Sequence, residues 1–302
     1  MKQSLILNSL LGQKDLVERY LGYSRRSLSS FSFTSIFAWQ DFFQFEFKLL
    51  EDCLCVFAQN ETGKFLYLPP LGKDVSSDVI EACFGMMEDV NRGSGVTRIE
   101  NVTAEQLPLF PTDKYKCDLR GHEYCYDRED IALLKGNAYK PKRSSYNHFV
   151  GHYQHRYIPY SDEMITECLD LYQRWADGRR RAHPEDIYTH MLDENRTVHE
   201  TVLRHCQPLG LTGRVVMVDG KIKAYTFGHE VNRDMFCVLF EISDLDVKGL
   251  SVYVFRELCR DAGLRRYRFI NAMDDFGLEN IRKTKQSFHP CVLLPAYVVT
   301  KK

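Results

Sequence analysis

The sequence has no run of apolar residues close to the ~20 that a helix needs to cross a bilayer. It also has no CxxC pair, no low-complexity segment and no linker rich in Pro, Gly or Ser between its two halves. We therefore expect a cytoplasmic protein without a transmembrane segment, whose 302 residues form two closely packed lobes. Ten cysteines are scattered through apolar segments, and we expect them to be reduced core residues.

Several catalytic motifs are missing as well. There is no GxSxG nucleophile motif, no Walker phosphate loop and no dinucleotide-binding glycine fingerprint. His148, His152 and His155 have no cysteine or acid at a suitable spacing, so we predict no metal site. Any chemistry must therefore be of a kind that needs few catalytic side chains.

The residues that are present suffice for a large core, because 44% of the chain is hydrophobic and 13% is aromatic. In the first half, residues 42–50 alternate apolar and polar side chains, which is typical of a half-buried strand. Residues 53–72 indicate two strands around an Asn-Glu-Thr-Gly turn. A helix over 76–93, with Ser76 or Ser77 as its N-cap, then leads to another short strand.

The second half of the chain repeats this order. Residues 213–230 predict a hairpin, because Asp219-Gly220 is a strong signal for a two-residue turn. The elements that follow are a strand at 235–242, a helix at 249–263 and a strand at 267–273. We interpret the two halves as a weak internal repeat of one α/β unit, visible in element order and not in residue identity.

The segment 135–156, between the halves, is basic and aromatic. It contains five Lys or Arg and no acid, with four aromatic residues interleaved. Cations neutralise phosphates and aromatic rings stack on unpaired bases, so the segment suits a polyanion. The candidate polyanion-binding residues are Lys140, Lys142, Arg143 and Tyr146. The alternative is a solvated surface strip.

A second basic group lies near the C-terminus. Residues 277–288 predict a short helix with Leu278, Ile281 and Phe288 on one face. Lys285 falls within that face, and we predict that it is mostly sequestered and faces a cleft. The alternative is a lysine whose stem packs on the core while its amine reaches water.

Three acids stand beside these elements. Glu241 ends a very apolar strand, so its carboxylate must reach solvent or be paired, either in a functional site or in a buried ion pair. Asp274 and Asp275 directly precede the predicted helix, and we expect one of them to be its N-cap.

The segments that carry a family resemblance are residues 126–149, 213–228, 240–249 and 269–290. They are similar to the soluble domain family related to the C-terminal domain of phosphatidylglycerol lysyltransferases, and the resemblance covers essentially the whole chain. It implies an α/β (α+β) fold of two tandem acetyltransferase-like (GNAT) lobes, an arrangement shared with Fem-type peptidyltransferases. Each lobe would be a mixed, mostly antiparallel sheet flanked by helices. We place the lobes at 1–134 and 157–302, joined by the basic segment 135–156.

The resemblance implies transfer of an aminoacyl group from aminoacyl-tRNA to a hydroxyl or amine. Because the donor ester is already activated, positioning and oxyanion stabilisation can carry most of the catalysis. Lys285 or Arg143 would stabilise the oxyanion, and Glu241 or Asp275 would bind an α-ammonium group or accept a proton. The candidate substrate-binding residues are Asn271, Arg282, Arg143 and Asn147, and the basic segment would bind the tRNA acceptor end or orient the cleft.

The acetyltransferase-like arrangement also makes a geometric prediction. The strands that end at Glu241 and Asn271 would be neighbours that splay apart at their C-terminal ends, where ligands of α/β sheets tend to bind. We therefore predict that Glu241, Asn271, Asp275 and Lys285 converge on one cleft.

Two departures from the family keep other functions open. We find no counterpart of the membrane-spanning half of the lysyltransferases, and we therefore expect a lipid acceptor to be less favoured than in that family. The acceptor can be a small molecule, a lipid head group or a peptide amine. Residues 246–251 carry Asp246 where acetyltransferases place a cation or amide for pyrophosphate, which makes acyl-CoA the weaker donor. The readings are a tRNA-dependent aminoacyltransferase, an acyl-CoA-dependent N-acyltransferase, and a non-catalytic binding protein on a degenerate scaffold.

Overall fold

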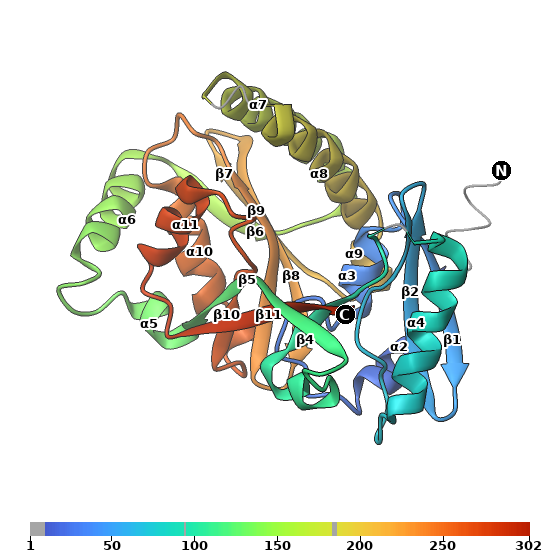
Figure 1. The fold of residues 1–302 in the computed structure, drawn as a ribbon. Coiled ribbons are helices and arrows are strands. Elements are labelled where there is room, and N and C mark those ends of the chain that lie inside the picture. The colour runs from blue at the N-terminus through green and yellow to red at the C-terminus, as the bar shows by residue number, and fades with distance from the viewer. Residues whose placement is uncertain (1–9, 94, 183–185) are drawn as a thin grey trace. The chain divides into compact units, whose positions relative to one another are not determined.

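The computed structural model describes residues 10–93, 95–182 and 186–302, which form two compact units (Figure 1). Unit 1 comprises the described residues up to 123 together with 274–277 and 293–302, and unit 2 comprises 124–273 and 278–292. These units begin and end at other residues than the predicted lobes, so the division at 134 and 157 stays a prediction.

Unit 1 contains a sheet and one long helix, which follows the third strand and precedes the fourth in the sequence. Its elements are α2 (Lys14–Leu21), α3 (Phe33–Ala38), β1 (Gln44–Leu50), β2 (Cys53–Asn60), β3 (Gly63–Leu66), α4 (Ser77–Asn91), β4 (Ile99–Thr103), a 3₁₀ turn (Ala104–Leu109), the first part of β5 (Tyr115–Asp127) and most of β11 (Val292–Lys301). Strands β1, β2 and β3 are antiparallel, β3 and β4 are parallel, and β11 is antiparallel to β4. The predicted serine cap is Ser76, whose hydroxyl accepts a hydrogen bond from the Val79 amide.

The last residue of α4 holds this helix against β3. The Asn91 side chain accepts a hydrogen bond from the Lys64 amide at 2.8 Å and donates one to the Lys64 carbonyl at 2.7 Å. The Asn91 amide group thus provides hydrogen-bond partners for both backbone groups of Lys64, a buried residue of β3, as a neighbouring strand would.

Unit 2 is built from one sheet and two layers of helices. Its elements after β5 are α5 (Arg128–Leu133), α6 (Lys140–His152), β6 (His155–Pro159), α7 (Ile165–Ala182), α8 (Asp186–Arg204), α9 (Cys206–Leu209), β7 (Thr212–Val218), β8 (Lys221–Asn232), β9 (Met235–Ser243), α10 (Leu250–Arg260), β10 (Phe269–Asn271) and α11 (Glu279–Gln286), with 3₁₀ turns at Asp162–Met164 and Ala262–Leu264. The strand order is β5-β10-β9-β8-β7-β6, and every neighbouring pair is antiparallel except β9 and β10. This mixed α/β architecture confirms the predicted fold class.

The strongest hairpin signal of the sequence is confirmed. Asp219 and Gly220 join β7 to β8, and both have a positive φ, at 49° and 77°. A two-residue turn of this kind needs left-handed residues at both positions, because only then does its twist match that of the strands.

Different helices cover the two faces of the unit 2 sheet. On one face, Phe236 and Val238 of β9 pack against Phe255 and Leu258 of α10. On the other face, Phe240 and Ile242 pack in a cluster with side chains of α7 and α8. The change of face within β9 follows from a β-bulge at 239, because Phe227 pairs with Phe240 while Gly228 pairs with Val238.

The ten cysteines are all free thiols, and eight of them are buried, as expected from their apolar surroundings. No helix in the described part of the chain is both long enough and apolar enough to span a membrane.

Candidate functional site

The candidate site begins where β9 and β10 stop pairing. Strand β10 has only three residues, and they pair with residues 235–237 of β9. Strand β9 continues to Ser243, six residues beyond its last partner on β10, while its other edge stays paired with β8. The edge of β9 that carries Glu241 is therefore not covered by β10. The sequence located this strand end correctly.

Glu241 is held in an environment that disfavours its charge. Part of the residue remains accessible, but its Oε2 atom is shut off from solvent and accepts no hydrogen bond from the described residues. Burial raises the pKa of the Glu241 carboxyl from its usual 4.5 to about 8. The alternative of a buried ion pair therefore finds no partner among those residues.

Thr226 lies directly across the ladder from Glu241, on β8. It is completely buried, and its Oγ1 atom also has no hydrogen-bond partner within the described ranges. Both side chains leave the sheet on the α10 face, opposite to Phe240. The same transverse row contains Arg214 of β7, whose Nε donates to Asp261 just beyond α10. Sequence reasoning missed Thr226, because a threonine within an apolar strand gives no signal of its own.

Asn271 ends β10 and is fully buried. Its Oδ1 accepts a hydrogen bond from the Met273 amide at 2.7 Å, and its Nδ2 lies 3.9 Å from the Met235 sulfur. Asn271 pairs with Cys237, so the side chains of these two residues lie on the same face of the sheet. The bulge in β9 lies between Cys237 and Glu241, and as a result the Glu241 side chain lies on the opposite face.

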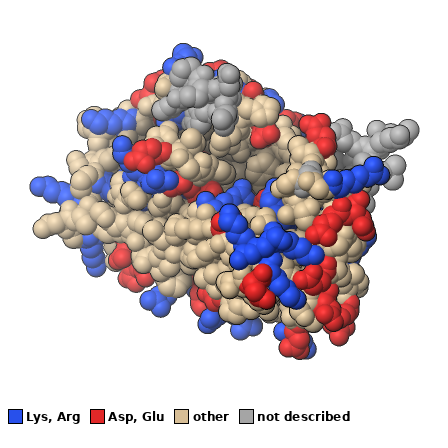
Figure 2. Space-filling model, viewed as in Figure 1, with Lys and Arg blue, Asp and Glu red and all other residues tan. Residues whose placement is uncertain are grey.

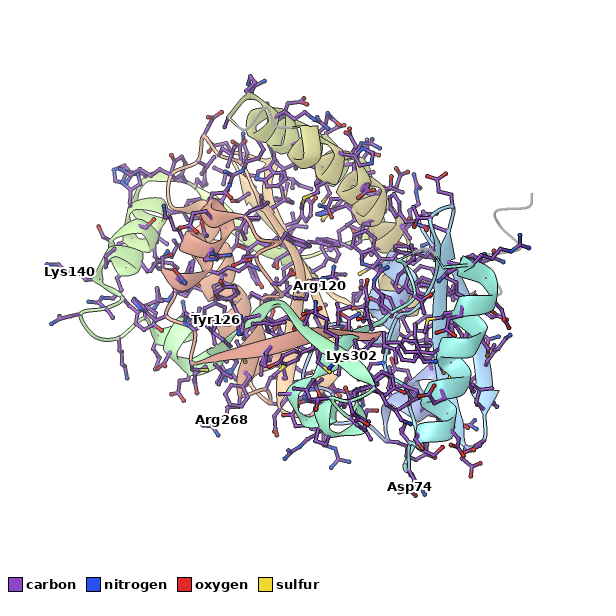
Figure 3. All side chains as sticks on the ribbon, viewed as in Figure 1. Asp74, Arg120, Tyr126, Lys140, Arg268 and Lys302 are labelled. Atoms are coloured by element: carbon purple, nitrogen blue, oxygen red, sulfur yellow. The ribbon has the colours of Figure 1, made fainter. Side chains whose placement is uncertain are left out.

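Lys285 lies on the α10 side of the sheet. Its Nζ donates a hydrogen bond to the Ala272 carbonyl at 2.5 Å and stands 5.7 Å from the centre of the Tyr124 ring. Its own carbonyl accepts a hydrogen bond from Tyr126, which is labelled in Figure 3. The lysine is half-buried, with its amine held at the C-terminal end of β10. Its catalytic role stays a prediction.

The loop before α11 contains Asp275, which was predicted both as a possible N-cap and as a site residue. The N-cap of α11 is Leu278, which has no side-chain cap bond, and Asp275 instead accepts a hydrogen bond from the Gly277 amide at 2.9 Å. The expected aspartate N-cap is therefore wrong, because the chain makes a tight turn before the helix begins. Asp275 belongs to unit 1 and the other three predicted site residues to unit 2, so their convergence on one cleft stays a prediction.

Arg282 of α11 was predicted to bind substrate. Arg282 is partly exposed and lies 3.5 Å from Glu279, one helical turn earlier. Its predicted role in substrate binding has no further support in the described contacts.

The basic segment folds mainly as α6, and its predicted residues differ in their surroundings. Lys140 and Asn147 are exposed, and Lys140 lies at the outer edge of this helix (Figure 3). Lys142 donates to the Ser287 hydroxyl at 2.6 Å, and burial lowers the pKa of its amine to about 8. Arg143 donates to two backbone carbonyls at 2.5 Å, those of residues 134 and 136.

Tyr146 packs inward from the same helix. Its hydroxyl donates to Glu257 of α10 at 2.8 Å, its ring stacks on Tyr253, and the Arg256 guanidinium lies 4.1 Å from its centre. Lys142, Arg143 and Tyr146 thus have structural partners, while Lys140 presents its charge to solvent. Polyanion binding by all four stays a prediction.

A further group of cations lies on unit 1 and was not found from the sequence. Figure 2 shows blue side chains gathered over the region of β5 and β11, where Figure 3 labels Arg120 and Lys302. Lys114 and Lys116 of the same segments are also exposed, and Arg120 forms an ion pair with Glu100 at 2.5 Å. These residues are far apart in the sequence, so only strand pairing reveals the group.

Comparison with known proteins gives the chain a family. Residues 22–300 match the family described as phosphatidylglycerol lysyltransferase, C-terminal. The chain therefore belongs to this family, as the resemblance implied. No curated protein matches it.

Two solved structures share the fold over nearly the whole chain. A conserved protein of unknown function from Bacteroides thetaiotaomicron is 25% identical, with 97% of each chain covered and a TM-score of 0.83. L-PGS from Bacillus licheniformis is 14% identical, with 95% of this chain and 91% of that chain covered and a TM-score of 0.68. Family membership supports the general class of acyl or aminoacyl transferases, without identifying donor or acceptor.

Proposed function

We propose that this protein transfers an aminoacyl group from an aminoacyl-tRNA to a hydroxyl or amine acceptor. The single observation that supports a site in this chain is the Glu241 carboxyl, whose Oε2 atom is buried without a hydrogen-bonding partner in the described structure, on the part of β9 that does not pair with β10. Proteins rarely bury an unpaired carboxyl unless it serves a ligand or a reaction. Family membership supplies the class of reaction.

The proposed reaction requires little covalent participation by the protein. The acceptor oxygen or nitrogen attacks the ester carbonyl carbon, a new C–O or C–N bond forms, and the bond to the tRNA ribose oxygen breaks. The acceptor loses one proton and the ribose oxygen gains one, so no further reactant is needed. The ammonium of Lys285, at the end of β10, would stabilise the negative charge that develops on the carbonyl oxygen.

The acyl-CoA alternative is weakened by the start of α10. Gly249 is the N-cap of this helix with φ at 88°, and a Cβ there would stand 2.3 Å from the Ser145 carbonyl oxygen of α6. This glycine therefore permits close packing of two helices. In the preceding loop, the Asp246 amide donates a hydrogen bond to the Asp244 side chain, so this amide is not available to a pyrophosphate group. The carboxylate of Asp246 would also repel such a group.

A transfer assay tests the proposal. Purified protein is incubated with tRNA charged with radiolabelled amino acids and with two acceptors, phosphatidylglycerol vesicles and a soluble peptide amine. We expect label to move to one of them, and Glu241→Gln to abolish the transfer. Glu163→Gln, which changes an exposed carboxylate, is the matched control and should act as wild type.

Two other outcomes would contradict the proposal. If acetyl-CoA is consumed while charged tRNA is not, the protein is an N-acyltransferase. If neither donor reacts, but charged tRNA raises the melting temperature, the chain is a binding protein on a transferase scaffold.

A further inference from the structure

Two buried polar atoms face the same space between the sheet and α10. Thr226 and Glu241 are direct partners on β8 and β9, and such partners have Cβ atoms roughly 4.5–5.5 Å apart on one face of the sheet. Neither Thr226 Oγ1 nor Glu241 Oε2 has a hydrogen-bond partner within the described residues. They do not bond to each other either, so the structure holds two unpartnered oxygen atoms side by side, both of which can accept hydrogen bonds once the carboxyl is ionised.

This pair lies at the edge that β10 leaves uncovered. The last residue of β9 that pairs with β10 is Cys237, and Glu241 follows four residues later. Glu241 keeps part of its surface accessible, whereas Thr226 has none. Any ligand group that binds the pair would therefore approach from the side of Glu241.

The chemistry of the two atoms restricts what such a group can be. A carboxylate oxygen only accepts hydrogen bonds, and a hydroxyl oxygen accepts them as well. A group that satisfies both atoms as acceptors must bring at least two donors, and a positive charge would also offset the unfavourable burial of the carboxylate. A primary ammonium has three N–H donors and one positive charge. An acetyl thioester has neither at its acyl group.

We propose that Thr226 Oγ1 and Glu241 Oε2 together bind the α-ammonium group of the aminoacyl donor. This inference rests on the proposed function and makes it more specific, because it assigns Thr226 as a binding residue and favours an aminoacyl ester over an acyl thioester as the donor. Burial raises the pKa of the Glu241 carboxyl, so this group is uncharged at neutral pH without a ligand. An ammonium bound beside it would favour its ionised form.

Variants of Thr226 test this assignment. Thr226→Val removes the hydroxyl while keeping the size of the side chain, and Thr226→Ser keeps the hydroxyl. We expect Thr226→Val to raise KM for aminoacyl-tRNA at least about tenfold with little change in kcat, because a hydrogen bond to a charged group is lost. Thr226→Ser should restore most of the affinity. Tyr157→Phe removes another buried, unpartnered hydroxyl of the same unit, and it should leave KM unchanged.

A donor with a blocked amine provides the second arm. Wild-type protein should transfer N-acetyl-aminoacyl groups poorly, and Thr226→Val should have no additional effect on this donor. Equal use of free and N-acetylated donors would overturn the inference while leaving the transferase function intact. The same holds if Thr226→Val changes only the melting temperature, since the pair would then have a purely structural role.

Failure of the proposed function is distinguishable from failure of this inference. If wild-type protein transfers nothing, binding is measured by thermal shift with lysine amide and with α-N-acetyl-lysine amide. A shift with the probe whose α-amine is free, absent with the α-N-acetylated probe and lost in Thr226→Val, would support the ammonium site without a reaction. No difference between the two probes would refute it.

Discussion

Replacing Glu241 by Gln is expected to remove a pH-dependent penalty on folding. In the native protein, burial raises the pKa of this carboxyl from 4.5 to about 8. Between these values the folded state keeps a proton that the unfolded chain has lost. The free energy of unfolding is therefore unaffected by this group below pH 4.5 and falls as the pH rises toward 8.

The size of the effect follows from the shift. At about 1.4 kcal/mol per pKa unit, the full shift corresponds to at most about 5 kcal/mol, and partial exposure of the residue reduces this to about 2–4 kcal/mol. Gln has the same shape but does not ionise. We thus expect Glu241→Gln and wild type to be similar in stability at pH 4.5, and the variant to be more stable by about 2–4 kcal/mol at pH 9.

Urea unfolding at pH 4.5, 7 and 9, followed by tryptophan fluorescence, measures this difference. All other titrating groups are common to both proteins, so their contributions cancel in the comparison. Glu163→Gln should follow wild type at every pH. Parallel curves for Glu241→Gln and wild type would refute the reasoning, because they would mean that the carboxylate ionises in the folded state without cost.

Four further predictions concern stability and charge. Asn91→Ala should lower the free energy of unfolding by about 2–4 kcal/mol in urea titrations, because the amide and carbonyl of Lys64 lose their partners. Burial lowers the pKa of His229 to about 4, so the unfolded state binds more protons from pH 6.5 down to 4 and stability falls over that window; His229→Leu should flatten the slope between pH 7 and 4.5 in the same titration. Arg143→Lys should reduce the melting temperature, since it breaks two bonds to backbone carbonyls. Lys140→Ala should leave that temperature unchanged but reduce the salt dependence of tRNA binding in filter-binding assays.

Local signals predicted most elements of the fold. The Asp219-Gly220 turn and the Ser76 cap depend only on neighbouring residues, so both could be read from the sequence. The helix near the C-terminus was also found, although it spans Glu279–Gln286 and not 277–288. Its start was misplaced because the side chain of Asp275 accepts a hydrogen bond from the Gly277 amide in a turn, and the helix begins only after this turn.

The candidate site was predictable only in part, for a different reason. Glu241 and Lys285 were conspicuous because each is a charged residue in an apolar pattern. Arg143 was conspicuous for another reason, as one of five cations in a segment without acids, yet its guanidinium binds backbone carbonyls of the loop before α6. A charge that stands out in the sequence therefore marks a residue that needs a partner, and it does not reveal whether that partner is substrate or the protein's own backbone.

The side of the sheet that Glu241 faces depends on one residue. Without the bulge at 239, strict alternation along β9 would place Glu241 on the same face as Cys237 and Asn271. The bulge shifts the register so that Glu241 pairs with Thr226 on the α10 face. Bulges of this kind re-aim side chains next to functional sites. A single extra residue in β9 thus turns the side chains of Glu241 and Asn271 to opposite faces of the sheet, and it brings Glu241 beside a hydroxyl that no sequence pattern indicated.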